Sequence, residues 1–548
     1  IAGPTGTGPI VIAARIIEGL LTSLMPLAIV LGAILLFRTL TSSGAMKAIT
    51  VRLERAVPDP VLRVVLIAWS FSYLVEGLSG FGTPAALAAP LLVGLGFPPV
   101  RAASACLVMN TVPVVFGAVG MPIWFGLGEI GMSSEQLRSV ATSAAVVQCA
   151  AAPIVVALAL RLLFPWREVR ARAFPIGAII VATVGASTAT ALFSTEFPTI
   201  VGGVCGLAAA FAIGKFVGGG EGSGEPMTDR VPKPSIPLWR AAFPLGATVV
   251  LLAVTRIEPL GLRGLLNAES PSVAIDLGAL GDASISASLV ARLDDILGTG
   301  ISWSMALLYV PFIIPFIVVV LMSAPLLRLS ARRTIEVASS AARSLVLPAA
   351  ALAGALVFVK LMMHGGEAAP VVAIGRALAD GVAIIYGPLW LGAAPLVGAL
   401  GSFFSGSATV SNLTFAPVQA EIAEQLGLDT ARVLALQAIG AAMGNMVCVH
   451  NIVAVAAVLG LASGRREKTE GQPDAAPVNG GGPRAFATAP DDATASTVAS
   501  AEADASSASS SPDEAVDDPV AAILRLNALP LAAFAIVAAV AAAVLAII

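Results

Sequence analysis

The sequence predicts an all-α polytopic membrane protein with about 12–14 transmembrane segments, built as two inverted-topology repeats with broken helices or hairpins at the membrane midplane. Composition is the first reason: 57% of the residues are hydrophobic and 12% are charged, against about 25% charged in soluble proteins. The second is that apolar runs of about 20 residues, long enough to cross a bilayer, recur along nearly the whole chain. The third is a set of helix-breaking residues inside these runs, which recurs in the second half.

Hydropathy and length place the spanning segments in order. They fall at residues 19–38, 58–75, 77–96, 99–125, 137–163, 174–194, 197–217, 240–256, 301–327, 344–363, 388–404, 405–426 (poor and broken), 430–461 and 527–548. These segments divide the chain into a first transmembrane repeat region (1–217), an inter-repeat region with two spanning helices and an acidic extracellular loop (218–343), a second transmembrane repeat (344–461), an acidic cytoplasmic linker rich in Ala, Ser and Asp (462–526), and a terminal transmembrane helix (527–548).

Charge asymmetry gives the orientation. Basic residues gather in five loops: Lys47, Arg52 and Arg55; Arg161, Arg167, Arg170 and Arg172; Lys215, Arg230, Lys233 and Arg240; Arg328, Arg332, Arg333 and Arg343; Arg465, Arg466 and Lys468. The positive-inside rule places all five in the cytoplasm, and the acidic loop 257–300 then lies outside. If segment 77–96 were a re-entrant hairpin, every later loop would change sides, and the basic loops at 161–172 and 328–343 would lie outside. We therefore favour a crossing at 77–96, although one further hairpin elsewhere would return these loops to the cytoplasm.

The stretch from Glu76 to Pro122 carries groups that are costly in hydrocarbon. Glu76 is a carboxylate, glycines and Pro84 interrupt one segment, and Asn110 begins a break ending at Pro113 in the next. Such a stretch must face protein or a water-filled cavity. Broken helices that expose backbone groups near the midplane are how secondary transporters build substrate sites.

The same pattern occurs twice. The run from Ser23 to Arg38 resembles that from Ser344 to Lys360, with a proline, a Gly-Ala pair and a terminal cation in register. Ser79-Gly80-Phe81-Gly82-Thr83 matches Ser405-Gly406-Ser407-Ala408-Thr409, and Met109-Asn110 matches Gly444-Asn445. With the orientations above, the first copy starts from outside and the second from inside. This is the inverted repeat expected of an alternating-access carrier.

Polar residues at the breaks are the candidate substrate-binding residues. They are Ser79, Gly80, Gly82, Thr83, Asn110, Thr111, Ser405, Ser407, Thr409, Ser411, Asn412 and Asn445. The alternative is that they only cap broken helices. Glu76 is a candidate proton-coupling carboxylate or else a snorkelling interfacial residue, and His450 is a candidate proton carrier or else a satisfied core histidine.

Two runs are similar to a known family. EGLSGFGTPAALAAPLLVGLGFPPVRAASACLVMNTVPVVFGAVGMPI, and GSFFSGSATVSNLTFAPVQ together with LALQAIGAAMGNMVCVHNIVA, closely resemble the L-lactate permease family over essentially residues 19–461 plus the terminal helix. The resemblance implies a prokaryotic, multi-pass cell-membrane symporter that imports L-lactate, and glycolate or related 2-hydroxy monocarboxylates, with protons. It also implies that the given N-terminus is an internal point of a longer product, and that residues 462–519 are a lineage-specific insertion.

The expected partners are therefore a small 2-hydroxy monocarboxylate, a proton and the lipid bilayer. Helix N-termini supply about half a positive charge each for the carboxylate. A net charge of −3 gives no support for nucleic acid. Cys106, Cys149, Cys205 and Cys448 lie singly in apolar segments, so we infer neither a metal nor another cofactor. A monomer and a homodimer are both compatible with the sequence.

Rival functions come from other classes. A sodium-coupled carboxylate or dicarboxylate transporter would need a second cationic subsite, for which only Lys360 or Arg376 is available. An intramembrane serine protease would use Ser79, in a Gly-Leu-Ser-Gly match, as nucleophile and His450 as base. This four-residue motif is a weak signal, and a protease would not need the second copy of the pattern at Ser405. A channel would need rings of like groups instead of an inverted pair.

The segment from Ala462 to Pro519 should be dispensable for transport. It carries eleven acidic and four basic residues, has no apolar periodicity, and is expected to be disordered. Replacing it with a short Gly-Ser linker should leave uptake within a factor of about two. Abolished uptake by a correctly folded, membrane-inserted replacement would show that the segment has a structural or regulatory role.

Overall fold

The computed structural model of the chain describes residues 8–80, 82–217, 236–256, 260–364, 390–461 and 518–547. Within these ranges, nine helices are long and apolar enough to cross a membrane. Shorter apolar helices lie at Thr83–Gly94, Ile313–Leu326 and Trp390–Ser405, and the pair Ala331–Arg343 and Pro348–Met362 bends by 43°. The predicted polytopic helical membrane protein is confirmed, and several predicted segments correspond to short or broken helices.

The elements follow the chain in three groups. The first contains α1 (Pro9–Ser42), α2 (Ala45–Ala56), α3 (Pro60–Val64), the π-helix η1 (Val65–Phe71), α4 (Ser72–Ser79), α5 (Thr83–Gly94), α6 (Pro99–Asn110), the 3-10 helix η2 (Val112–Phe116), α7 (Gly117–Trp124), η3 (Gly128–Ile130), α8 (Ser134–Leu163), α9 (Trp166–Ala171), α10 (Ala173–Ala191) and α11 (Pro198–Val217). The second contains α12 (Leu238–Arg256), α13 (Leu262–Leu266), strands β1 (Ser272–Asp276), β2 (Asp282–Ser286), β3 (Val290–Asp294) and β4 (Trp303–Ala306), the π-helix η8 (Ile313–Val318), α14 (Val319–Leu326) and α15 (Ala331–Arg343). The third contains α16 (Val346–Met362), α18 (Trp390–Ser405), α19 (Ala408–Gln425), α20 (Thr430–Gly444), α21 (Val449–Val458) and α23 (Pro519–Ile547).

Side-chain caps fix where several helices begin. Ser133 and Gln136 form a reciprocal capping box at the start of α8, and the Asp59 carboxylate accepts from two backbone N–H groups at the start of α3. The Asp429 carboxylate caps α20 by accepting from one backbone N–H group. These residues satisfy N–H groups that have no partner inside their own helix.

Helices α1 and α16 pack antiparallel across the two halves. Near the start of α1, Glu18 pairs with Lys360 near the end of α16, with Nζ 3.0 Å from Oε1. Near the other end of α1, Arg38 donates to Ser340, just before α16. The two runs matched in the sequence therefore lie in opposite directions, as an inverted pair requires. The inverted repeat itself stays a prediction.

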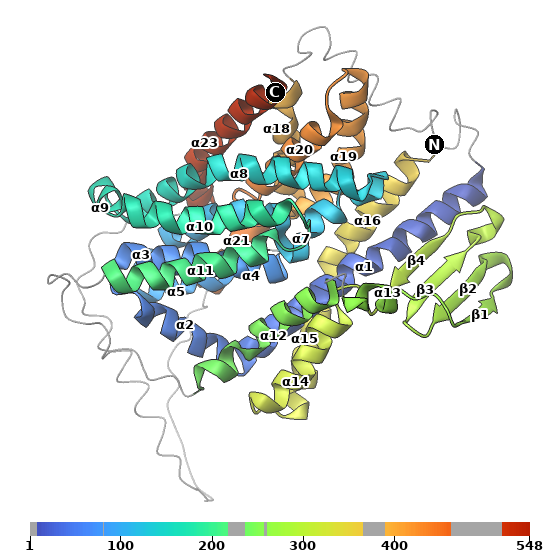
Figure 1. Cartoon of the computed structure of the whole chain (residues 1–548), viewed down its shortest axis with the longest axis horizontal. Coiled ribbons are helices and arrows are strands. Elements are labelled where there is room, and N and C mark those ends of the chain that lie inside the picture. The colour runs from blue at the N-terminus through green and yellow to red at the C-terminus, as the bar shows by residue number, and fades with distance from the viewer. Residues whose placement is uncertain are drawn as a thin grey trace, which may run out of the picture.

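The acidic loop contains a small β-sheet that was not predicted from the sequence. Strands β1 to β4 form an antiparallel sheet in sequence order, and it lies at the opposite end of the helix bundle from α9 (Figure 1). In the connection between β3 and β4, Ile296 and Ile301 pack with Ala14 of α1. The prediction of one spanning helix over 301–327 is wrong at its start, because β4 occupies Trp303–Ala306 and helix begins only at Ile313. Alternating apolar and polar residues over these short strands were the missed signal.

Two further boundaries differ from the prediction. Helix α4 continues past Glu76 to Ser79, so the first break lies between Ser79 and Thr83. Predicted segment 99–125 is divided into α6, η2 and α7 at the break that the sequence predicts from Asn110 to Pro113. Helix α23 begins at Pro519 and not at residue 527, because the Asp518 carboxylate accepts from the N–H groups of residues 520 and 521. Most of the predicted linker, residues 462–517, lies outside the described residues.

The topology can be tested by cysteine labelling on a cysteine-free background. Arg167, Arg333 and Asp282 are all exposed, and charge asymmetry predicts the first two in the cytoplasm and the third outside. Arg167→Cys and Arg333→Cys should react with an impermeant reagent only after permeabilisation, whereas Asp282→Cys should react in intact cells. Labelling of positions 167 and 333 from outside would contradict the inverted-repeat arrangement.

Candidate functional site

Two helix breaks, one from each half, meet at the centre of the protein. Helix α4 ends at Ser79 and α5 starts at Thr83, with Gly80 at φ +63° between them. Helix α18 ends at Ser405 and α19 starts at Ala408, with Gly406 at φ +72°. Glycine adopts these left-handed conformations without the steric cost that a side chain brings. The matched motifs therefore each place a glycine in a left-handed conformation at a helix break.

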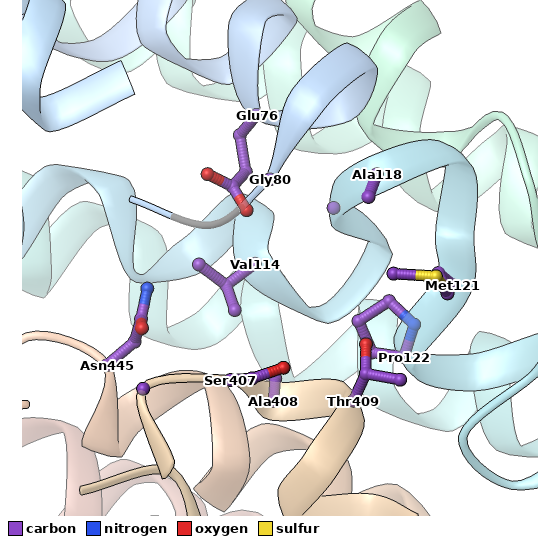
Figure 2. Close-up of a pocket in the computed structure, with 12 residues that line it drawn as sticks. Glu76, Gly80, Val114, Ala118, Met121, Pro122, Ser407, Ala408, Thr409 and Asn445 are labelled. Atoms are coloured by element: carbon purple, nitrogen blue, oxygen red, sulfur yellow. The ribbon is translucent and has the colours of Figure 1, made fainter. Parts of the chain in front are cut away.

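A small cavity lies between these breaks. It is lined by Glu76, Gly80, Val114, Gly117, Ala118, Met121, Pro122, Gly406, Ser407, Ala408, Thr409 and Asn445. Figure 2 shows Glu76 and Val114 reaching in from the first half, and Ser407, Thr409 and Asn445 facing them from the second.

Glu76 is the titratable side chain in this lining. Its side chain is only 2% exposed, and Asn110 Nδ2 donates to its Oε2 at 3.0 Å. Its other oxygen faces Gly117, where a Cβ atom would collide with Oε1. Glycine at position 117 thus leaves room for the carboxylate at the cavity wall.

The rest of the lining is neutral, and no Lys, Arg or His is among the twelve lining residues. The N-terminus of α19, an 18-residue helix, opens onto the cavity at Ala408 and Thr409. Ser407 caps this helix by accepting from the N–H of residue 410. The helix dipole and its first N–H groups supply positive potential without a cationic side chain.

The cavity wall that faces the N-terminus of α19 is formed by the broken segment from Asn110 to Trp124 (Figure 2). Ala118 and Val119 have positive φ angles of 46° and 60°, followed by Gly120 at 72°. Backbone in this conformation forfeits helical hydrogen bonds, and inside a membrane its polar groups need other partners.

Side chains from neighbouring helices provide these partners. Gln148 of α8 donates to the carbonyl of Val112, and Thr199 of α11 donates to that of Pro113 at 3.0 Å. From the second half, Asn412 Nδ2 donates to the Pro122 carbonyl at 2.8 Å. Three donors on three different helices thus hold the wall of the cavity in place.

The structure separates the predicted site residues into three groups. Glu76, Gly80, Ser407, Thr409 and Asn445 line the cavity. Seven others do not line it. The hydroxyls of Ser79, Thr111 and Ser405 donate to carbonyls of their own helices. Asn110 donates to Glu76, Ser411 donates to the Gly398 carbonyl, and Gly82 and Thr83 lie at the start of α5. Asn412 holds the Pro122 carbonyl.

His450 lies beside the second break without lining the cavity. It follows Cys448 in the first turn of α21, close to Gly406, and it is exposed. Residues that the sequence did not mark as candidates include Val114, Gly117, Met121 and Pro122. A signal was present, since Gly120 and Pro122 are a second helix-breaking pair in the same apolar run.

Comparisons with known proteins identify the family of this chain. The family described as L-lactate permease matches residues 6–468. A putative L-lactate permease from Haemophilus influenzae is 40% identical over 458 residues, covering 83% of this chain and 85% of the relative. The L-lactate permease of Salmonella typhimurium is 26% identical over 475 residues, covering 82% and 81%. The glycolate permease of Escherichia coli is 44% identical over 106 residues, 19% of each chain.

The resemblance seen in the sequence is thereby confirmed, and the family's members are permeases, not enzymes. The chain belongs to the L-lactate permease family and is a multi-pass protein of the bacterial cell membrane.

Proposed function

We propose that this chain imports L-lactate, and glycolate or related small 2-hydroxy monocarboxylates, by proton symport with alternating access. The central cavity is the substrate site, and Glu76 carries the coupled proton. One observation supports this most strongly: the twelve lining residues include one acid and no base.

The substrate carboxylate finds its positive potential at the N-terminus of α19. Thr409 and Ser407 stand beside that N-terminus, and Asn445 also lines the cavity. A monocarboxylate needs one such anion subsite plus neutral donors for its hydroxyl group. Val114, Ala118 and Met121 form an apolar wall that suits the short alkyl part of lactate.

Coupling follows from repulsion inside the cavity. Two unit negative charges about 4 Å apart repel by about 4 kcal/mol at an effective dielectric constant of about 20. A bound carboxylate therefore favours protonated Glu76, and a proton on Glu76 favours the bound carboxylate, because binding linkage is reciprocal. The doubly loaded cavity then carries one less negative charge than it would without the proton, which lowers the cost of reorientation within the membrane.

The rival functions lack comparable support. Lys360, considered as a second cationic subsite, is paired with Glu18 and with Glu129, whose Oε2 is 2.9 Å from Nζ. Arg376 lies outside the described residues. Ser79, the serine of the protease alternative, donates to the Val75 carbonyl at 2.8 Å, and neither Ser79 nor His450 lines the cavity.

Glu76→Gln should separate transport from coupling. Because glutamine mimics the protonated carboxyl, we expect loss of lactate accumulation driven by a pH gradient, with exchange of lactate down its own gradient retained. Glu76→Asp should lower the rate and keep coupling. Radiolabelled lactate uptake into proteoliposomes, under an imposed pH gradient and then an imposed sodium gradient, measures both effects.

Glu424→Gln is the matched control, since Glu424 is an exposed acid on α19. It should accumulate lactate as the unsubstituted protein does. Accumulation of lactate against its gradient by Glu76→Gln, with the pH gradient as sole driving force, would place the proton on another group. Uptake driven only by sodium would replace proton symport with the sodium-coupled alternative.

A further inference from the structure

The terminal helix α23 packs between the two halves of the protein. It contacts α6 and α8 of the first half, and α18, α20 and α21 of the second, and in Figure 1 it runs beside α18. Ile523, Phe534 and Ala538 are buried. The helix thus packs against both halves of the protein, although residues 459–518 separate it from α21 in sequence.

One residue of this helix is polar and fully buried. Asn527 has 0% exposure, and its Nδ2 donates to the carbonyl of Met446 at 2.6 Å. A buried amide in an apolar membrane helix costs free energy unless it is hydrogen-bonded. Alanine and leucine, which are common in this helix, would avoid that cost.

Met446 lies in the break between α20 and α21, directly after the cavity-lining Asn445. The amide of Asn451 donates to both the backbone carbonyl and the side-chain Oδ1 of Asn445. With Oδ1 occupied as an acceptor, the Nδ2 group of Asn445 is left to donate toward the cavity. Asn451 therefore orients the Asn445 side chain, and Asn527 holds the next peptide group.

The opposite wall of the cavity is held by the same kind of contact. Gln148, Thr199 and Asn412 donate to carbonyls of the first broken segment. Asn527, on the terminal helix, makes the same kind of contact with the break between α20 and α21.

We propose that Asn527 is a positioning residue of the substrate site, which acts through Met446 to hold Asn445 at the cavity wall. This inference rests on the proposed function, because it takes the cavity as the site of lactate binding. It gives one residue of the terminal helix, Asn527, a role in substrate binding, whereas the preceding segment 462–517 is expected to be dispensable for transport.

The test uses the full-length chain in proteoliposomes, with lactate counterflow measured over a range of concentrations. Asn527→Leu keeps a similar volume and removes the donor, so we expect the KM for lactate to rise about tenfold. The maximal rate per folded carrier should stay within about twofold of the unsubstituted protein. Asn527→Gln, which retains an amide donor, should recover part of the affinity.

Two variants of the same helix serve as controls. Leu529→Ala, at a position 67% exposed, should leave KM and rate unchanged. Phe534→Leu weakens buried packing and should lower the amount of folded carrier with KM unaltered. If Asn527→Leu gives no folded carrier, Asn527→Ala takes its place, because it also removes the donor, with the same expected rise in KM.

The outcomes separate the two proposals. An unchanged KM in folded Asn527→Leu or Asn527→Ala, with normal lactate counterflow by the unsubstituted protein, overturns the positioning role alone. Absence of lactate counterflow by the unsubstituted protein overturns the proposed function, and the positioning role with it.

Discussion

Backbone polar groups that a broken helix releases inside a membrane must find partners, and the rest of this structure depends on how that is done. An unpaired carbonyl in hydrocarbon costs several kcal/mol, so the breaks at the cavity persist only where neighbouring helices donate. Gln148 and Thr199, in the first half of the chain, donate to carbonyls of the broken segment 110–124. Asn412, in the second half, donates to another carbonyl of that segment. These contacts allow helix ends to turn toward a central cavity.

Turning helix ends inward gives the cavity its electrostatic character. The N-terminus of α19 offers positive potential to an anion while the lining holds no cationic side chain. A permanent cation would bind lactate in every state of the cycle, whereas a helix terminus in a cavity with one carboxyl group makes binding depend on the proton. Glu76 is thus the group through which we propose that a proton and a monocarboxylate become mutually dependent.

Much of this arrangement is visible in the sequence. Carboxylate, glycine, serine and threonine inside apolar segments are costly unless they face a cavity. On that ground Glu76, Gly80, Ser407 and Thr409 are predicted at a common site, and all four line the central cavity. Met121 was missed because an apolar side chain at a cavity wall has the same pattern as one facing lipid.

Other features leave little trace in the sequence. The pairing of Asn412 with the Pro122 carbonyl joins residues 290 positions apart, and no local pattern marks it. The strands of the sheet in the acidic loop alternate apolar and polar residues, but this signal is weak because each strand has only four or five residues. We propose that lactate and a proton cross together as a neutral pair, and proteoliposomes of the unsubstituted protein, loaded with a pH-sensitive dye and clamped at zero potential with valinomycin and potassium, test this directly. Adding external lactate in sodium-free buffer should acidify the interior, with one proton per radiolabelled lactate and no change when the clamped potential is varied. Lactate entry without acidification, or entry that requires sodium, would contradict neutral proton symport.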